Sequence, residues 1–357
     1  MSIVEELMRE DVRRMELYQV QPVSGMKLDA NESPFSMSED FRRKIAQWIL
    51  EEEDLRIYPD TDCTLLREAI AKRWDLESGQ VLCAVGSDQI IDYLNKAFLN
   101  TGDSIVVPAP SFSMYALSAR INHGEAHAFA LSEDFSYPVE EILSLCRQVR
   151  PKILYLCTPN NPTGNVIPET DLRRLIQEAG CIVACDEAYG EFSGEDHSAY
   201  LAEYPNLVIL KTFSKAYALA GIRTGFALAQ PELIQALDRV RAPYNLSTLS
   251  QLIARKALAQ PEYEEEIRTI RSERDRIYEE LAPLKGQNGF WIYPSQANFF
   301  LMKFSGEDAA VRLLKKGLLV RAYGGDMARF VRSSVGSREE NDALIHAIVQ
   351  IIKEDSR

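Results

Sequence analysis

The feature that most constrains the fold is a repeated alternation of short apolar runs with helical patterns between about residues 80 and 230. Strands that are apolar on both faces and alternate with helices form a mainly parallel sheet, which helices cover on both sides. The sequence therefore predicts an α/β fold whose large domain has three layers, α/β/α. The apolar runs are VLCAV (81–85), SIVVP (104–108), KILYLC (152–157), CIVACD (181–186), LVILKT (207–212) and GFALA (225–229).

The two ends of the chain have a different character. A long charged helical pattern over residues 261–284 precedes alternating strand and helix patterns, which indicates a smaller α+β domain. The start of the chain has the pattern of one charged amphipathic helix. We therefore expect an N-terminal arm over residues 1–30 that packs on the small domain or on a partner subunit. A large domain over residues 31–245 and a small domain over residues 246–357 would follow it.

The composition limits the partners. The chain has 357 residues, a formal charge of −13 and no apolar run near the ~20 residues of a membrane helix. Nucleic acids and anionic membranes bind clustered Lys and Arg, so neither is an expected partner.

Six cysteines without CxxC spacing favour free thiols in the cytoplasm over disulfides or a metal site. No zinc site is expected at His123 and His127, which alternate with other residues in a predicted strand.

Several polar segments directly follow the apolar runs, where ligands bind in open parallel sheets. Some of them carry groups suited to a phosphate. Free amides at the start of a helix attract anions, although Ser and Asp are also ordinary helix caps. Hydroxyls and the fork of an arginine suit phosphate oxygens as well. The candidate phosphate ligands are Gly86, Ser87, Asp88, Thr212, Ser214 and Arg223.

A second set of residues suits an aromatic ring. The carboxylate of Asp186 directly follows a buried strand and needs a cation, such as a protonated pyridine nitrogen. Asn161 and Tyr189 can donate to an oxygen on that ring, and Phe112 can lie on its face. A Ser-Lys pair alone would be typical of a surface loop, but Lys215 in such a pocket can react with a carbonyl. Phosphate, pyridine, phenolic oxygen and aldehyde together describe pyridoxal 5′-phosphate.

The order of the motifs resembles the fold type I, aspartate-aminotransferase-like family of pyridoxal-phosphate enzymes. PNNPTG (159–164), DEAY (186–189), SK (214–215) and an arginine eight residues later follow one another with the family's spacing. The segments KLDANESPF, RIYPD, APSFSMY, YNLSTLSQ and FVRSSVG extend the resemblance along nearly the entire chain. Together they are similar to the histidinol-phosphate aminotransferase branch of the family.

The resemblance implies a role for each cofactor residue. Lys215 would form the Schiff base and move the substrate's α-proton, and Asp186 would face the pyridine nitrogen. Asn161 and Tyr189 would bind the ring hydroxyl, and Phe112 would stack on the ring. Ser87, Asp88, Ser214 and Arg223 would surround the phosphate. Tyr58 would reach the phosphate from the neighbouring subunit, which implies a homodimer with shared active sites.

The substrate residues follow from the same resemblance. Arg332 matches the arginine that holds the substrate carboxylate, while Arg321 and Tyr18 match positions associated with a substrate phosphate. Asn31 is a further expected substrate residue. A surface charge at a strand end is the alternative for Arg321. Serines in VRSSVG and the SPF segment depart from the branch's common pattern, and they leave the choice of substrate open.

The expected reaction converts L-histidinol phosphate and 2-oxoglutarate to imidazole acetol phosphate and L-glutamate, a step of histidine biosynthesis. O-phospho-L-threonine decarboxylation and aromatic amino acid transamination are the alternatives on the same scaffold. A regulator that binds the cofactor without turnover is a further alternative. The net charge and the absence of a helix-turn-helix pattern argue against it.

Overall fold

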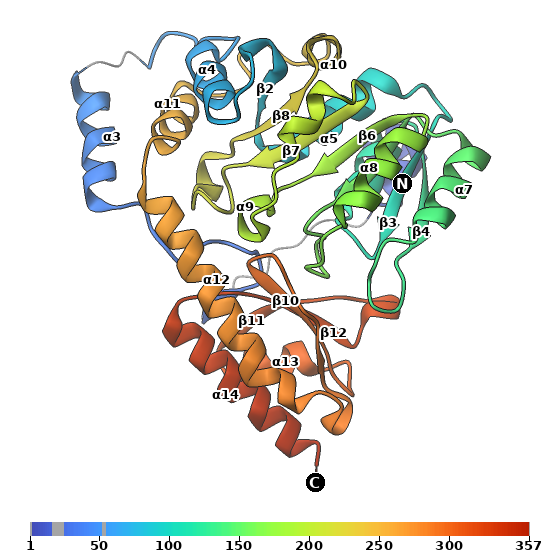
Figure 1. Cartoon of the computed structure of the whole chain (residues 1–357), viewed down its shortest axis with the longest axis vertical. Helices are drawn as coiled ribbons and strands as arrows, with labels where there is room; N and C mark the ends of the chain where they lie inside the picture. The colour runs from blue at the N-terminus through green and yellow to red at the C-terminus, as the bar shows by residue number, and fades with distance from the viewer. Residues whose placement is uncertain (1, 16–24, 52–54, 357) are drawn as a thin grey trace.

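The computed structural model describes residues 2–15, 25–51 and 55–356 (Figure 1). Its larger sheet has seven strands in the order β2-β8-β7-β6-β5-β3-β4. All neighbours are parallel except β8, which is antiparallel to β2 and β7. Each predicted strand is confirmed, and so is the mainly parallel sheet. The strands are β2 (Val81–Ala84), β3 (Ser104–Ala109), β4 (Glu125–Ala130), β5 (Ile153–Cys157), β6 (Ile182–Asp186), β7 (Leu207–Thr212) and β8 (Gly225–Ala229).

Helices cover both faces of this sheet, so the large unit has the expected three layers (Figure 1). Side chains alternate across a strand. Leu207 and Ile209 of β7 therefore join one core, while Val208 and Leu210 join the other. The first core includes side chains from α4 (Thr64–Arg73), α7 (Val139–Val149), α8 (Glu169–Glu178) and α11 (Thr248–Ala257). The second includes side chains from α5 (Gly86–Phe98), α6 (Met114–Ile121) and α10 (Pro231–Asp238).

The second sheet has five strands in the order β1-β11-β12-β10-β9. Strand β1 lies within the predicted N-terminal arm, yet it pairs in parallel with β11 and so completes this sheet. The α+β character of the smaller unit is confirmed, while its predicted boundaries stay predictions. Its elements are β1 (Met26–Leu28), β9 (Trp291–Ile292), β10 (Phe299–Lys303), β11 (Leu318–Ala322), β12 (Phe330–Ser334), α12 (Glu262–Leu281), α13 (Ala309–Lys315) and α14 (Arg338–Glu354).

Other helices connect the two sheets or lie at their edges. They are α3 (Glu39–Glu51), α9 (Gly190–Ser193), η1 (Ser78–Gln80), η2 (Ser198–Ala202), η3 (Ala220–Ile222), η4 (Ala282–Leu284), η5 (Gln287–Gly289) and η6 (Gly325–Met327), where η denotes a 3-10 helix. Within residues 2–15, 25–51 and 55–356, no helix combines the length and the apolar character that crossing a membrane requires.

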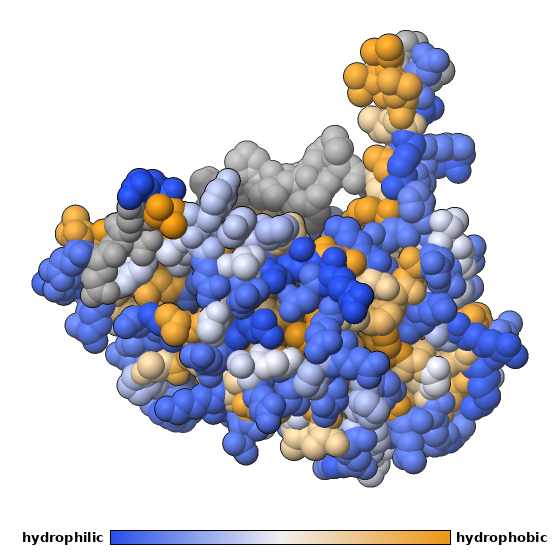
Figure 2. All heavy atoms as spheres, turned by 90° about the horizontal axis from the view of Figure 1, so that it is seen from above, coloured by the Kyte–Doolittle hydropathy of each residue, from blue (hydrophilic) through white to orange (hydrophobic). Residues whose placement is uncertain are grey.

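The prediction of one continuous helix at the start of the chain is wrong. The described residues form two short helices, α1 (Ile3–Leu7) and α2 (Glu10–Arg13), separated by extended backbone at Met8 and Arg9. Arg9 lies in this extended stretch, and its guanidinium donates to the carbonyl of Ile121 at 3.2 Å. Helices this short gain little stability of their own. The α1 segment stands out from the body of the molecule (Figure 2).

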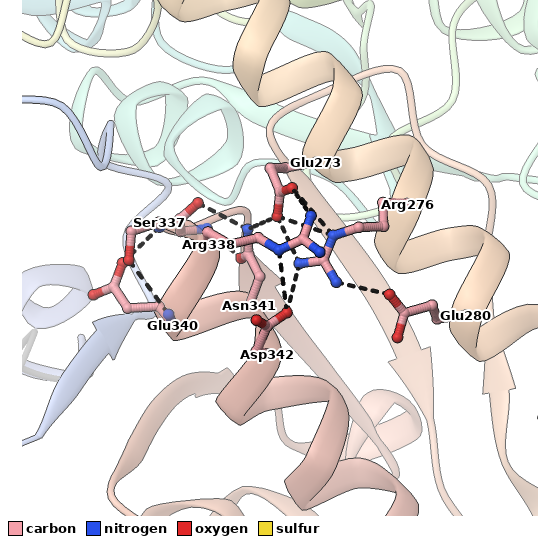
Figure 3. A network of polar contacts seen from close by, with 9 residues as sticks. Glu273, Arg276, Glu280, Ser337, Arg338, Glu340, Asn341 and Asp342 are labelled. Carbon is pink, nitrogen blue, oxygen red and sulfur yellow. Dashed lines mark hydrogen bonds and ion pairs between the residues drawn. The ribbon is translucent and has the colours of Figure 1, made fainter.

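A polar network joins α12 to α14 in the smaller unit (Figure 3). The Glu273 carboxylate accepts hydrogen bonds from Arg276 (2.7 Å), Arg338 (2.8 Å) and Asn341 (2.9 Å). Burial alone would raise the pKa of Glu273. The hydrogen bonds from these three donors outweigh that effect and lower the pKa to about 2. Asp342 adds an ion pair with Arg276 at 2.9 Å. The network therefore fixes one helix on the other through an ionised carboxylate.

Candidate active site

The predicted phosphate ligands meet at the N-terminus of α5. Arg223 Nη2 lies 3.6 Å from Asp88 Oδ2, and Arg223 Nη1 donates to Ser214 Oγ at 3.3 Å. Thr212 Oγ1 donates to the same hydroxyl at 3.0 Å. Ser87 is the second residue of α5, where backbone N–H groups have no partner inside the helix. Amides, hydroxyls and a guanidinium therefore gather at one place, which is a donor set for a phosphate.

Two glycines make this gathering possible. Gly86 has φ of +74°, in the left-handed region, and a Cβ there would lie 2.9 Å from Arg223 Nη2. Gly225 opens β8 directly against the start of α5, where a Cβ would lie 2.5 Å from Ser87 N. Because a side chain at either position would displace the phosphate donors, both positions require glycine.

Asp186 ends β6 and is 3 % exposed. Tyr115 donates a hydrogen bond to its Oδ2 at 2.7 Å, and the amide of Ala188 donates to Oδ1 at 3.0 Å. Burial raises the pKa of Asp186 to about 6 although both hydrogen bonds lower it. Within the described part of the chain, no cationic side chain forms an ion pair with this carboxylate. A protonated ring nitrogen would supply the missing positive charge.

Lys215 is the amine of the candidate site. Its Nζ donates to the carbonyl of Ala30 at 2.8 Å and lies 5.8 Å from the ring centroid of Tyr189. Burial, followed by the charge of Arg332, lowers the pKa of Lys215 to about 8. A lysine with this pKa has a substantial neutral fraction near pH 8, as a nucleophile and a base require.

The expected ring-oxygen ligands form a hydrogen-bonded group. The Tyr189 hydroxyl accepts from Asn31 Nδ2 at 3.0 Å and from Asn161 Nδ2 at 3.5 Å. Asn31 has φ of +54° and is fully buried. Its backbone N–H donates to Ser334 Oγ at 2.8 Å, and its carbonyl accepts from Asn298 at 3.2 Å. The loop after β1 is thus held against the second sheet, and it carries Asn31 into the site.

Arg332 is a buried arginine whose charge meets only neutral acceptors in the described residues. Its Nη1 donates to Asn161 Oδ1 at 2.6 Å and its Nη2 to the carbonyl of Asp29 at 2.5 Å. Its Nε is buried without a hydrogen-bond partner. Arg321 lies directly opposite Arg332 in the pairing of β11 with β12. Two guanidinium-bearing residues at one end of the second sheet form a candidate site for anions.

The remaining predicted residues lie at different places. Phe112 contacts Tyr115 edge-on, with ring centroids 5.6 Å apart, and so lies beside the partner of Asp186. Tyr58 is 77 % exposed and stacks on Tyr244 of its own chain at 4.5 Å. Its contact with a neighbouring subunit's phosphate stays a prediction. Tyr18 lies outside the described residues.

Sequence reasoning missed Tyr115, Asn298 and Ser334. Tyr115 follows Phe112 by three residues at the start of α6, and helical spacing offered a signal for it. Asn298 and Ser334 are 267 and 303 residues from Asn31 along the chain. No local pattern connects them to the site, because the packing of the two sheets brings them there.

The residues present fit pyridoxal 5′-phosphate on structural grounds. The site contains a phosphate donor set, a buried carboxylate without a cationic side-chain partner, donors for a ring oxygen and an amine with a lowered pKa. The unpartnered Nε of Arg332 fits a substrate anion beside the ring. Each of these groups matches one functional group of the cofactor or its substrate.

Comparison with known proteins agrees with this chemistry. The sequence profile of aminotransferase class I and II matches residues 23–348. A histidinol-phosphate aminotransferase from Ruminiclostridium cellulolyticum is 38% identical over 357 residues, which cover 98% of this chain and 99% of that protein.

Solved structures share the fold. The histidinol-phosphate aminotransferase from Sinorhizobium meliloti, in complex with pyridoxal-5′-phosphate, has a TM-score of 0.86 and 23% identity, and the match covers 98% of each chain. The L-threonine-O-3-phosphate decarboxylase from Porphyromonas gingivalis has a TM-score of 0.78 and 21% identity, over 92% of this chain and 99% of that one. Its sequence profile and its relatives show that the chain belongs to the aminotransferase class I and II family.

Proposed function

We propose that the protein is a pyridoxal-phosphate-dependent aminotransferase that converts L-histidinol phosphate and 2-oxoglutarate to imidazole acetol phosphate and L-glutamate. The observation that carries this proposal is the placement of Arg332, which lies opposite Arg321 in the sheet, donates to Asn161 and lowers the pKa of Lys215 through its charge. Such a site suits one substrate with a carboxylate and another with a phosphate. The relative from Ruminiclostridium cellulolyticum, named for this activity, supports the choice of substrate and a role in histidine biosynthesis.

The cofactor would supply an electron sink for the bond broken at the substrate α-carbon. Lys215 would hold the cofactor and, once released, move the α-proton with its neutral amine. Asp186 would keep the ring nitrogen protonated, and Asn161 and Tyr189 would bind the ring oxygen. Phe112 would cover one face of the ring. The phosphate would be bound by Gly86, Ser87, Asp88, Thr212, Ser214 and Arg223, with Tyr58 from a neighbouring subunit.

Residues on the other side of the ring would bind the substrate. Arg332 would bind the carboxylate of glutamate and the phosphate of histidinol phosphate in turn. Arg321 and Tyr18 would contact mainly the phosphate. Asn31 would orient Tyr189 through their hydrogen bond of 3.0 Å while facing the substrate.

We infer that the protein is a homodimer with shared active sites. Apolar side chains are exposed in the chain segments around Tyr58 and at its stacking partner Tyr244, and a second copy would cover them. They are Leu50, Leu55, Ile57, Leu65 and Tyr244. The projecting α1 segment also exposes Ile3, Val4 and Leu7 (Figure 2). We also propose a cytoplasmic location, which the six free cysteines support because disulfides are rare there.

A second candidate function is the decarboxylation of O-phospho-L-threonine. The same pair of arginines would bind its carboxylate and phosphate, and a decarboxylase for this substrate shares the fold. The two reactions differ in which bond of the α-carbon breaks, so their products separate them.

The experiment is a panel of amines with purified enzyme, added pyridoxal phosphate and 2-oxoglutarate. The amines are L-histidinol phosphate, O-phospho-L-threonine and L-phenylalanine, and both L-glutamate and carbon dioxide are measured. We expect L-glutamate to form fastest with L-histidinol phosphate and to be absent with the Lys215→Ala variant. Carbon dioxide from O-phospho-L-threonine, or a preference for L-phenylalanine, would overturn the proposed substrate.

A further inference from the structure

A second cluster of charged side chains lies buried beside the active site. Lys211 of β7 is 2 % exposed, and its Nζ lies 2.9 Å from Glu187 Oε2 and 3.5 Å from Glu191 Oε1. His197 Nδ1 lies 2.8 Å from the other oxygen of Glu187. The ammonium group also lies 5.6 Å from the ring centroid of Trp74. None of these five residues has a role in the chemistry proposed above.

The cluster is an ion network and not a metal site. Cys185, Glu187 and His197 present ligand atoms that all lie within 4.8 Å of one another. The ammonium of Lys211, however, already lies against the Glu187 carboxylate at 2.9 Å. A metal ion would have to displace that positive charge or be repelled by it, so Lys211 is itself the cation that the carboxylate binds.

The network lies on the face of the sheet opposite Asp186. Trp74 and Phe192 belong to one core, whereas Tyr115, which binds Asp186, belongs to the other. Lys211 continues the alternation that places Leu207 and Ile209 of β7 in the first core, so it and its partner Glu187 lie on that side. The network thus lies on the other face of the sheet from the Asp186 carboxylate and its partner Tyr115.

The backbone nevertheless connects the network to the cofactor residues directly. Glu187 follows Asp186, and its amide donates to the carbonyl of Leu210 on β7 at 2.9 Å. Tyr189 is two residues beyond Glu187, and Lys215 is four residues beyond Lys211. The Glu187–Lys211 ion pair therefore links the ends of two strands from which the ring-nitrogen, ring-oxygen and amine groups all extend.

A contribution to stability alone does not account for such a network. Burial of two charges costs about as much as their attraction returns, and neutral side chains of similar volume are often equally stable in their place. The loop that carries Tyr189 is instead packed tightly on the ion pair. A Cβ at Gly190 would lie 3.2 Å from Glu187 Cβ and 3.5 Å from Lys211 Nζ.

We propose that Glu187, Lys211 and His197 are positioning residues for amino transfer. By tying β6 to β7, the network fixes Asp186 and Tyr189 relative to Lys215. This inference rests on the proposed function, because it assigns the network to that reaction.

The test is the double variant Lys211→Met/Glu187→Gln, which removes both charges of the 2.9 Å ion pair. Glu191 then loses its cation at 3.5 Å, and because burial already raises the pKa of this carboxyl group, we expect it to take up a proton. A matched control, Lys316→Met/Glu354→Gln, removes the ion pair of 3.3 Å between the end of α13 and α14. We expect the test variant to keep a melting temperature close to the parent's and an unchanged KM for L-glutamate. Its kcat should fall about tenfold to a hundredfold, since a misplacement of about 1 Å costs up to ~10²-fold.

A second readout needs neither cofactor nor substrate. Amide hydrogen exchange of the cofactor-free test variant should be faster than the parent's over residues 186–190 and 211–216, and unchanged elsewhere. The control variant should match the parent in both measurements. A kcat within about twofold of the parent's, or unchanged exchange in these two segments, would overturn the proposal.

A further variant keeps the proposal testable if the double variant does not fold. His197→Gln removes one partner of Glu187 and preserves its ion pair with Lys211. We expect a smaller loss of kcat, with faster exchange over residues 186–190; unchanged values of both would overturn the proposal. Turnover of L-histidinol phosphate by the parent tests the proposed function separately, because the exchange measurement does not depend on the substrate.

Discussion

Lys215 and Asp186 have pKa values shifted in opposite directions for the same physical reason. Burial disfavours the charged form of each group, so it lowers the pKa of Lys215 to about 8 and raises that of Asp186 to about 6. The lysine is thereby prepared to react as a neutral amine. The carboxylate, in contrast, becomes a strong binding group for a cation that neutralises the cost of its burial.

The lowered pKa of Lys215 predicts how cofactor attachment depends on pH. An exposed lysine has a pKa of about 10.4, so a buried one becomes neutral at a pH some two units lower. When pyridoxal phosphate is added to cofactor-free protein, the rate at which the visible absorption band appears should rise through pH 8 and then level off. The band should not appear with Lys215→Ala. A rate that still rises steeply at pH 10 would contradict the assignment.

Tyr115 offers a second prediction at this scale. Its hydrogen bond of 2.7 Å lowers the pKa of Asp186, so Tyr115→Phe should raise that pKa further. Hydrogen bonds to charged groups contribute ~1.5–3 kcal/mol, which corresponds to a loss in kcat of up to about tenfold to a hundredfold. The acidic limb of the profile of kcat/KM against pH should move to higher pH.

The control for Tyr115 is its stacking neighbour Tyr155, at 4.8 Å. The hydroxyl of Tyr155 donates to Asn95 instead of Asp186. Tyr155→Phe therefore removes a buried hydroxyl without changing the carboxylate's hydrogen bonds. If both variants gave the same pH profile, Tyr115 would have no specific influence on Asp186.

At the scale of elements, the α12–α14 network predicts a pH-dependent contribution to stability. An exposed glutamate has a pKa of about 4.3, and that of Glu273 in the folded protein is about 2. A depressed folded-state pKa stabilises the protein above about pH 4.3, and this stabilisation is lost as the pH falls toward 2. Glu273→Gln should thus lower the free energy of unfolding by about 1–3 kcal/mol at pH 7.

The effect of Glu273→Gln should shrink as the pH falls from 7 to 3, as measured by urea unfolding at several pH values. Glu265→Gln is the matched control, since Glu265 lies on the same helix with its side chain 72% exposed and pairs with Arg268. Exposed pairs contribute little, so this control should change the free energy of unfolding by less than about 1 kcal/mol. A destabilisation by Glu273→Gln that is independent of pH would refute the role of the ionised carboxylate.

The strands were predictable because their burial is uniform. Strands such as residues 153–157 and 207–212 are buried on both faces. An uninterrupted apolar run in the sequence is typical of a strand buried in this way. The polar residues at the strand ends, such as Asp186 and Lys215, were predictable because ligands bind at that edge. The break between α1 and α2 was not: it occurs where Arg9 contacts the distant Ile121, and no local pattern indicates that contact.

Contacts between distant segments account for the other gaps in the prediction. Strand β1 joins the second sheet through β11, almost 300 residues away, and three residues give no signal of such a pairing. Lys211 belongs to an apolar strand pattern, and its partner Glu187 directly follows β6, the neighbouring strand of the sheet. Patterns along the chain describe which side chains are buried, but they do not identify the pairs that form in space.

At the scale of the whole molecule, the proposed homodimer makes a prediction about shared sites. Tyr58 is exposed on its own chain, and the proposed contact with the phosphate would come from a second copy. A heterodimer of a Tyr58→Phe subunit and a Lys215→Ala subunit would contain one site with both residues intact. Purified heterodimers carrying two different tags should therefore show about half of the parent's activity per dimer. Activity no higher than that of the Tyr58→Phe homodimer would indicate that each site is built within one chain.

The measurement that tests the central claim most directly separates the two half-reactions in single-turnover experiments that follow the absorption of the bound cofactor. The claim is that Arg332 binds both the carboxylate of glutamate and the phosphate of histidinol phosphate. Arg321, opposite it in the sheet, would bind mainly the phosphate. Arg332→Lys should slow the reactions with L-glutamate and with L-histidinol phosphate alike, because lysine lacks the planar fork.

Arg321→Ala should slow only the reaction with L-histidinol phosphate. A charge-assisted hydrogen bond contributes ~1.5–3 kcal/mol, so the expected loss is about one to two orders of magnitude. The reaction with L-glutamate should stay within about twofold of the parent's rate. Equal losses in both half-reactions would contradict the proposed phosphate role of Arg321 and would favour an aminotransferase that reads carboxylates alone.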